Sequence, residues 1–141
     1  ADPRVTKTAM LADLHLPVRP GTDPALLAFA VRHVLRTRPD DLYLTECVDS
    51  ASLERLRALV QPFTPERAAE VCGIDAAEVS AFADLLTAAR RIGIETGTGV
   101  SMGRSANLTE WLVWASGAVT GSLDRDGGST FNAGFLRAAD G

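Results

Sequence analysis

The chain has 141 residues, of which 46% are hydrophobic and 23% are charged, and its net charge is −4. This length and apolar content suffice for a single domain with a buried core over residues 1–141. The acidic balance offers no general attraction to nucleic acid or anionic lipid, and no stretch reaches the roughly 20 apolar residues of a membrane helix. We therefore expect no nucleic-acid partner and no membrane partner.

The first fifth of the sequence predicts a short strand followed by a turn and a helix. Residues 12–18 alternate between apolar and polar side chains, and the prolines in and after them place the strand at an edge or a terminus. Asp23 is suited to cap a helix whose first position is Pro24, where the missing N–H costs nothing. That helix should end before Pro39, because the residue preceding a proline disfavours the helical conformation.

The middle of the sequence predicts further helices with clear boundaries. A helical stretch covers about residues 40–60 and is interrupted near Asp49 and Ser50. Thr64 opens a short helix toward Cys72, and Gly73 stops it, because glycine readily adopts the left-handed conformation that ends helices.

The next helix, over residues 75–90, begins with Asp75 and Glu78 at the spacing of a capping box. The corner formed with the preceding helix has the spacing of a helix-turn-helix, so a DNA-binding or helical interaction module is the alternative function. Every ionisable residue over positions 68–89 is acidic, however, and phosphates would repel such a recognition helix. We therefore interpret this segment as a structural corner.

The last third predicts a second strand, a glycine-rich turn and a helix. Residues 92–96 alternate as a strand, residues 97–103 contain three glycines, and a helix follows over residues 108–119. Asn107 and Glu110 have the spacing of a capping box at the start of this helix. The overall pattern is α/β and helix-rich, and two short strands are too few for a free-standing sheet.

The glycine-rich turn has two interpretations. It lies between a strand and a helix, where glycines let backbone N–H groups approach a phosphate. Met102 occupies the place of the third glycine in the dinucleotide-binding pattern, so the match is incomplete. A simple tight turn and a nucleotide site both remain open.

The sequence contains no arrangement of residues that indicates a catalytic or metal site. His15 and His33 are far apart and have no partner at the spacing of metal ligands. Cys47 and Cys72 lack both a CxxC spacing and a neighbouring basic cluster, which indicates inert thiols in a reducing compartment. We therefore expect no self-sufficient active site and a cytoplasmic location, with a domain of an exported protein as the alternative.

Four stretches of the sequence carry motifs that match one family. They are Asp2-Pro3-Arg4, residues 12–23 ending in Pro20-Gly21-Thr22-Asp23, the loop Thr98-Gly99-Val100-Ser101-Met102, and residues 119–128. Together they resemble the cofactor-binding middle of the molybdopterin oxidoreductases, which include formate dehydrogenases, periplasmic nitrate reductases and dimethyl sulfoxide reductases. The resemblance implies a helix-rich partial Rossmann-like domain with a short parallel sheet. It also implies an internal fragment of a larger enzyme, in keeping with the absence of an initiator methionine.

The resemblance implies which residues bind the cofactor, molybdopterin guanine dinucleotide with molybdenum or tungsten. They are Asp2, Pro3, Arg4, Pro20, Gly21, Thr22, Asp23, Thr98, Gly99 and Met102. The carboxylate of Asp23 would accept the paired N1–H and N2–H donors of guanine, although capping the helix remains an equal alternative. Arg4 would hold the diphosphate or ribose, and Thr98, Gly99 and Met102 would line the pterin. The family usually has Gln where this chain has Met102.

The implied partners follow from what the parent enzyme needs. The remaining domains of the parent would complete the cofactor site, and an iron–sulfur cluster or another electron-transfer partner would take the electrons. We expect the fragment alone to be inactive and to retain no bound cofactor.

Overall fold

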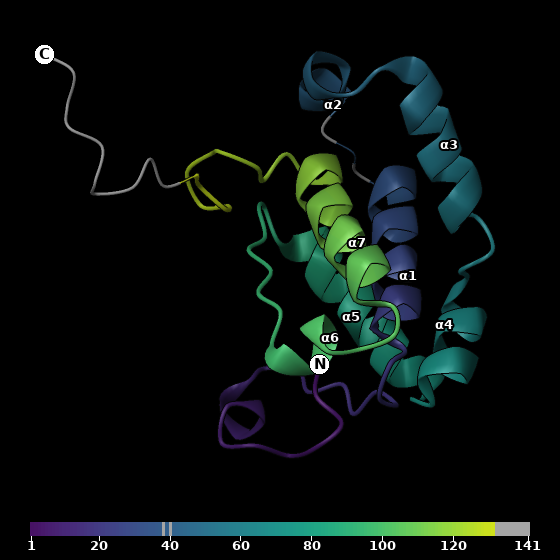
Figure 1. Cartoon of the computed structure of the whole chain (residues 1–141), viewed down its shortest axis with the longest axis vertical. Helices are drawn as coiled ribbons and strands as arrows, with labels where there is room; N and C mark the ends of the chain where they lie inside the picture. The colour runs from purple at the N-terminus through teal and green to yellow at the C-terminus, as the bar shows by residue number, and fades with distance from the viewer. Residues whose placement is uncertain (38, 40, 132–141) are drawn as a thin grey trace, which may run out of the picture.

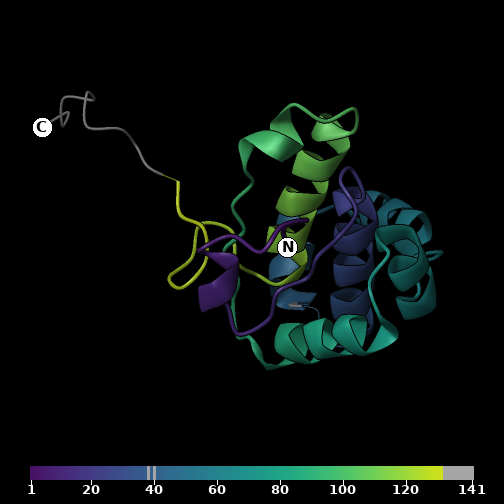
Figure 2. The same cartoon turned by 90° about the horizontal axis from the view of Figure 1, so that it is seen from below.

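The computed structural model describes residues 1–37, 39 and 41–131. Its elements are, in chain order, the short 3-10 helix η1 (Ala9–Leu11) and the helices α1 (Asp23–Thr37), α2 (Asp41–Cys47), α3 (Ser50–Val60), α4 (Pro65–Cys72), α5 (Ala76–Ala88), α6 (Thr98–Ser101) and α7 (Ala106–Val119). Figures 1 and 2 show α3, α4, α5 and α7 gathered around α1, with long connecting segments on one side. The helix-rich architecture predicted from the sequence is confirmed.

Helix α1 forms the centre of the fold, in contact with α3, α4, α5 and α7 (Figure 1). It ends at Thr37, as predicted from the following Pro39. Val31 is fully buried and belongs to a core cluster shared with α3 and α7, whereas Phe29 belongs to a second cluster shared with α4 and α5. Burying side chains of this size contributes roughly 1.5–3 kcal/mol each, so α1 is the main source of hydrophobic stabilisation.

The predicted boundaries of the middle helices are confirmed. The stretch expected over residues 40–60 divides into α2 and α3 near Asp49, whose carboxylate accepts a 2.9 Å hydrogen bond from the Ser52 N–H; residue 40 itself lies outside the described residues. Thr64 caps α4, and Gly73 ends that helix with φ of 69°. The Glu78 carboxylate accepts a 2.8 Å hydrogen bond from the Asp75 N–H, which completes the predicted capping box.

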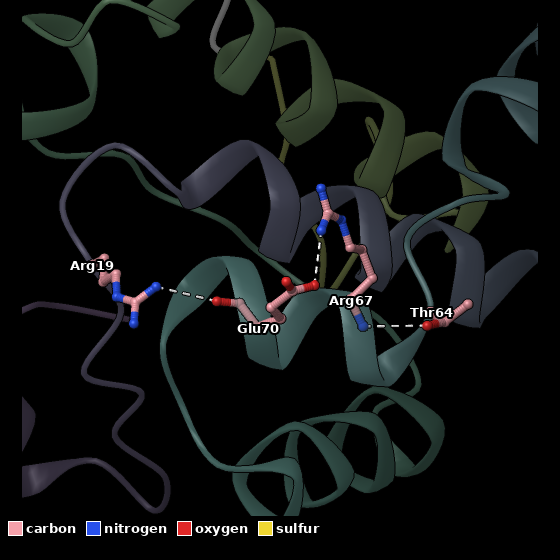
Figure 3. A network of polar contacts seen from close by, with 4 residues as sticks. All are labelled: Arg19, Thr64, Arg67 and Glu70. Carbon is pink, nitrogen blue, oxygen red and sulfur yellow. Dashed lines mark hydrogen bonds and ion pairs between the residues drawn. The ribbon is translucent and has the colours of Figure 1, made fainter.

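Arg19 attaches the segment before α1 to the corner between α4 and α5. Its backbone N–H donates to the Cys72 carbonyl at 2.8 Å, and its guanidinium donates to the Glu70 carbonyl at 3.2 Å. Figure 3 shows the neighbouring contacts of this network, in which Arg67 donates to the Glu70 carboxylate at 2.8 Å and from its backbone to Thr64 at 3.3 Å. The corner therefore fixes the turn that leads into α1.

The two segments predicted as strands, residues 12–18 and 92–96, do not form a ladder within the described part of the chain. There, the pairing of Leu123 with Ser129 is an isolated parallel bridge outside any strand. The hydrogen bonds of the two segments go elsewhere: Leu16 accepts from the Asp2 N–H, and the Ile92 N–H donates to the Ser122 hydroxyl. A strand requires a neighbouring strand, so the predicted parallel sheet is not formed by these residues alone.

The predicted start of the last helix is wrong. Helix α7 begins at Ala106, two residues before the expected start, and Ser105 occupies the cap position without a side-chain cap. The carboxylate of Glu110 instead accepts a 2.6 Å hydrogen bond from the Thr96 hydroxyl, so it is not available for a capping box with Asn107.

Candidate functional site

A cavity of about 340 Å³ lies between the first half of α1, the extended segment 92–97, α5 and α7. Its apolar wall includes Leu26 of α1, Phe82 and Leu86 of α5, and Val113 of α7. This volume is at the lower end of the range for small-molecule sites, and the mainly apolar wall is typical of such sites. The cavity is therefore large enough for a small organic group with a small number of polar contacts.

Asp23 places a carboxylate on the wall of this cavity. It is the first residue of α1, and the carbonyl of Thr22 accepts the helix-starting hydrogen bond from the Ala25 N–H at 2.9 Å. The Thr22 hydroxyl in turn donates to the Arg19 carbonyl at 2.6 Å, which fixes the turn. Within the described residues, the Asp23 carboxylate makes no hydrogen bond or ion pair, so the alternative role of capping α1 is not realised.

The segment 92–97 forms the wall opposite α1. Glu95, Thr96 and Gly97 all line the cavity, and the bond from Thr96 to Glu110 holds this segment against α7. Sequence reasoning did not identify Glu95 and Thr96 as site residues. In the sequence, this segment is marked only by its alternating apolar and polar residues, and such alternation does not show which residues line a cavity.

The loop predicted to line the pterin forms the short helix α6, which follows Gly97. Val100 of this helix lines the cavity. Thr98 and Gly99 are exposed, and the side chain of Met102 is 83% exposed. The structure thus brings α6 to the rim of the Asp23 cavity, with Thr98, Gly99 and Met102 open to solvent.

Of the predicted residues at the start of the chain, Asp2 lines a second, smaller cavity of about 150 Å³, whereas Pro3 and Arg4 do not line it. The Asp2 carboxylate accepts a 2.8 Å hydrogen bond from the Arg4 N–H, and the Asp2 carbonyl lies 2.7 Å from Nε2 of His15. Pro3 and the side chain of Arg4 are exposed. Ala1 lines both cavities, so the two predicted groups of residues lie near one another.

The predicted turn residues Pro20 and Gly21 are exposed, and Gly21 has φ of 81°, a left-handed conformation that favours glycine. Below this turn lies Cys72, whose Sγ is 3.7 Å from the Thr22 carbonyl. Burial is the largest cause that raises the pKa of this thiol, and the negative charge of Asp23 adds to the effect. The thiol therefore stays neutral at physiological pH.

The charges at the large cavity favour hydrogen-bond donors over anions. Asp23 and Glu95 are both acidic, and no basic side chain lines this cavity in the described part of the chain. A ligand group that offers N–H donors is complementary to these carboxylates, whereas a phosphate would be repelled. The two carboxylates therefore disfavour a phosphate group placed beside them.

The histidines serve structural roles. His15 contacts the Asp2 carbonyl, and Nε2 of His33 lies 2.8 Å from the Thr87 hydroxyl, which connects α1 to α5. Over residues 1–37, 39 and 41–131, no three metal-ligating side chains come together. In the same residues, no helix is both long enough and apolar enough to span a membrane.

Comparison with known proteins identifies the family. No protein-family model matches the sequence. The chain is 30% identical over 126 residues to formate dehydrogenase H of Escherichia coli, and 31% identical over 128 residues to the molybdopterin-binding-like subunit of menaquinone reductase of Nitratidesulfovibrio vulgaris. These matches cover 88% and 91% of this chain but 17% of each relative.

The fold is also similar to that of a solved structure. Acetylene hydratase from Pelobacter acetylenicus matches with a TM-score of 0.77 and 28% identity, over 86% of this chain and 16% of that one. Sequence and fold thus agree over most of the described residues, and the chain spans about a sixth of the length of the proteins it matches. The chain belongs to the molybdopterin oxidoreductase family and corresponds to part of those longer proteins.

Proposed function

We propose that this chain holds the guanine end of molybdopterin guanine dinucleotide within a larger molybdenum- or tungsten-dependent oxidoreductase. The observation that supports this most directly is the Asp23 carboxylate, which lines the cavity and has no hydrogen-bond partner in the described residues. No side-chain oxygen in the described residues is both buried and without a partner, so the carboxylate oxygens of Asp23 are open to solvent and accessible to a ligand that donates two hydrogen bonds.

Guanine fits this arrangement chemically. Its N1–H and N2–H groups lie side by side and match the two oxygens of a carboxylate, whereas the corresponding edge of adenine presents one acceptor and one amino donor. The apolar wall formed by Leu26 and Phe82 offers surface for the face of a purine. The size and the chemistry of the cavity therefore suit the guanine base alone, and the rest of the dinucleotide would lie outside the cavity.

The other predicted residues would act outside the cavity. Arg4 is exposed, and its side chain is available to the ribose or diphosphate, which the carboxylates of Asp23 and Glu95 would repel from the cavity itself. Asp2, Pro3, Pro20, Gly21 and Thr22 would shape the approach of the nucleotide. Thr98, Gly99 and Met102, at the rim, would contact the pterin through backbone groups and the Met102 thioether.

The remaining domains of the parent would complete both the fold and the chemistry. Strands from outside this chain would pair with residues 92–96 and produce the partial Rossmann-like α/β domain with its short parallel sheet. The bound metal and pterin would supply the two-electron chemistry of a formate dehydrogenase-like or nitrate reductase-like enzyme, with an iron–sulfur cluster or similar partner as the electron acceptor. We infer a cytoplasmic location from the two unpaired thiols, Cys47 and Cys72.

A nucleotide titration tests the role of Asp23. Guanosine monophosphate should shift the NMR signals of the 141-residue chain in a saturable way at millimolar concentration, and adenosine monophosphate should bind more weakly. Asp23→Asn should weaken guanosine monophosphate binding about tenfold, because the amide cannot accept both hydrogen bonds. Glu46→Gln makes the same charge change on α2, away from the cavity, and should leave binding unchanged. If the Asp23→Asn variant and the unmodified chain bind guanosine monophosphate with equal affinity, Asp23 does not bind the base.

A further inference from the structure

A second, basic groove lies between α1 and α3, away from the Asp23 cavity. Its volume is about 180 Å³, and Arg32, Arg36 and Arg57 line it over a floor formed by Leu35 and Val60. Figure 1 shows α1 and α3 side by side. The three arginines bring three positive charges to one small groove, although the net charge of the chain is −4.

The groove is too far from Asp23 to belong to the same site. Arg36 lies in the last turn of α1, whereas Asp23 is its first residue. At a rise of 1.5 Å per residue, the two positions are separated by about 20 Å along the helix axis. A ligand in the groove would therefore bind independently of the base that we propose for the cavity.

The guanidinium groups are only partly used by contacts within the chain. Arg32 donates from Nε to the Gln61 carbonyl at 3.1 Å, and Nε of Arg57 lies 3.6 Å from the Glu54 carboxylate. Both contacts use Nε and leave terminal N–H groups available. Arg36 makes no side-chain hydrogen bond or ion pair within the described residues.

The acidic groups near the groove neutralise it only in part. The Glu54 side chain is 75% exposed, and exposed pairs of this kind bind weakly. Glu66 is also exposed, and hydrogen bonds from Thr64 and from its own backbone N–H lower the pKa of its carboxyl more than the charge of Arg32 does. Arg32 and Arg36 lie four residues apart on α1, where like charges destabilise a helix. An anion between them would relieve that repulsion.

We propose that this groove binds a phosphate group. Three guanidinium groups bind a ligand with two negative charges better than they bind a monovalent carboxylate. Their planar forks also donate paired hydrogen bonds to tetrahedral oxyanions. The Gln61 carbonyl holds Arg32 in place, and the apolar floor excludes water from one side of the ligand. The shared chemistry fits both inorganic phosphate and the phosphate group of a small ester.

Titration of the 141-residue chain with sodium phosphate tests this site, with ionic strength held constant by sodium chloride and binding followed by the arginine side-chain NMR signals. Phosphate should saturate the site, and acetate should bind more weakly. Arg36→Gln and Arg57→Gln should each weaken phosphate binding about tenfold, because each removes charged donors from one small groove. A second titration, with phenyl phosphate, distinguishes an ester from the free ion. Tighter binding of phenyl phosphate would mean that the apolar floor contacts the organic part of an ester.

Arg55→Gln is the matched control. It removes the same charge from α3, but Arg55 does not line the groove, and its Nε donates to the Ala51 carbonyl one turn earlier. Phosphate binding should persist in this variant. The proposal is overturned if phosphate shows no saturation, if acetate binds equally well, or if Arg55→Gln weakens binding as much as Arg57→Gln. Asp23→Asn should not affect phosphate binding, so the two proposals fail independently.

Discussion

The Thr96 hydroxyl donates a 2.6 Å hydrogen bond to the carboxylate of Glu110 and thereby joins the extended segment 92–97 to α7. No strand pairing supports this segment within the described residues, so this bond and the one from the Ile92 N–H to the Ser122 hydroxyl together position one wall of the cavity. The same contact explains why Glu110 does not cap the helix that contains it.

Removing this bond should destabilise the chain and loosen the cavity wall. Thr96→Val keeps the shape of the side chain but leaves Glu110 without its donor, and we expect a loss of about 1 kcal/mol in the free energy of unfolding. Urea denaturation followed by circular dichroism measures the change. Thr130→Val alters an exposed threonine that makes no side-chain hydrogen bond in the described residues, and it should change stability by less than about 0.5 kcal/mol. Equal effects of the two variants would contradict the assigned role of Thr96.

Alanine substitutions at three glycines should distinguish the cost of backbone strain from the cost of steric contact. Gly73 has φ of +69°, and an added Cβ would lie 2.4 Å from Nε of Arg19. Gly21 has φ of +81° with open space around it, and Gly93 has open space without a positive φ. Substitution by alanine should therefore cost about 1–2 kcal/mol at Gly73, about 1 kcal/mol at Gly21 and less than about 0.5 kcal/mol at Gly93.

Thermal unfolding of the three alanine variants checks this order. Because Arg19 is flexible, its guanidinium can move away from a new Cβ at Gly73, but it would then lose its bond to the Glu70 carbonyl. A Gly93→Ala variant less stable than Gly73→Ala would contradict the description of the corner.

The buried thiol of Cys72 should make stability fall at alkaline pH. Burial raises the pKa of Cys72 in the folded chain above its ordinary value. Above about pH 8.5, the unfolded chain therefore loses this proton before the folded chain does, and stability declines as pH rises toward the folded pKa. The urea midpoint should decrease between pH 7 and pH 9.5, and it should decrease less in Cys72→Ala.

The exposed Cys47 serves as the internal comparison for thiol reactivity. In the folded chain, iodoacetamide should modify Cys47 much faster than Cys72, since the thiolate is the reactive form and Cys72 is both buried and protonated. Equal labelling rates under native conditions would mean that the corner opens readily.

The helical corner could be predicted from sequence because its signals are local. Thr64, Gly73 and the pair Asp75–Glu78 act within one turn of the helix ends that they define. The start of α7 could not be predicted in this way, because Thr96, which is 14 residues away from Glu110, competes successfully for its carboxylate. A capping pattern cannot reveal such a distant partner.

The site could be predicted only in part for a related reason. The motif ending in Asp23 identified the residue that lines the cavity, but the cavity wall also comes from residues 92–97, α5 and α7, which are distant in sequence. The two predicted strands could not be verified from local pattern either. Their alternation predicts strands, but residues 12–14 bend instead, and a sheet depends on neighbours that the described residues do not supply.

Capture of the intact protein from its source with an antibody to this chain tests the central claim most directly. The size of the captured protein, its molybdenum or tungsten content, and the nucleotide that mild acid hydrolysis releases from its cofactor would be measured together. We predict a polypeptide several times larger than 14.9 kDa that contains the metal and releases guanosine monophosphate. A metal-free protein of 14.9 kDa, or a cofactor that releases no guanine nucleotide, would contradict the proposed function.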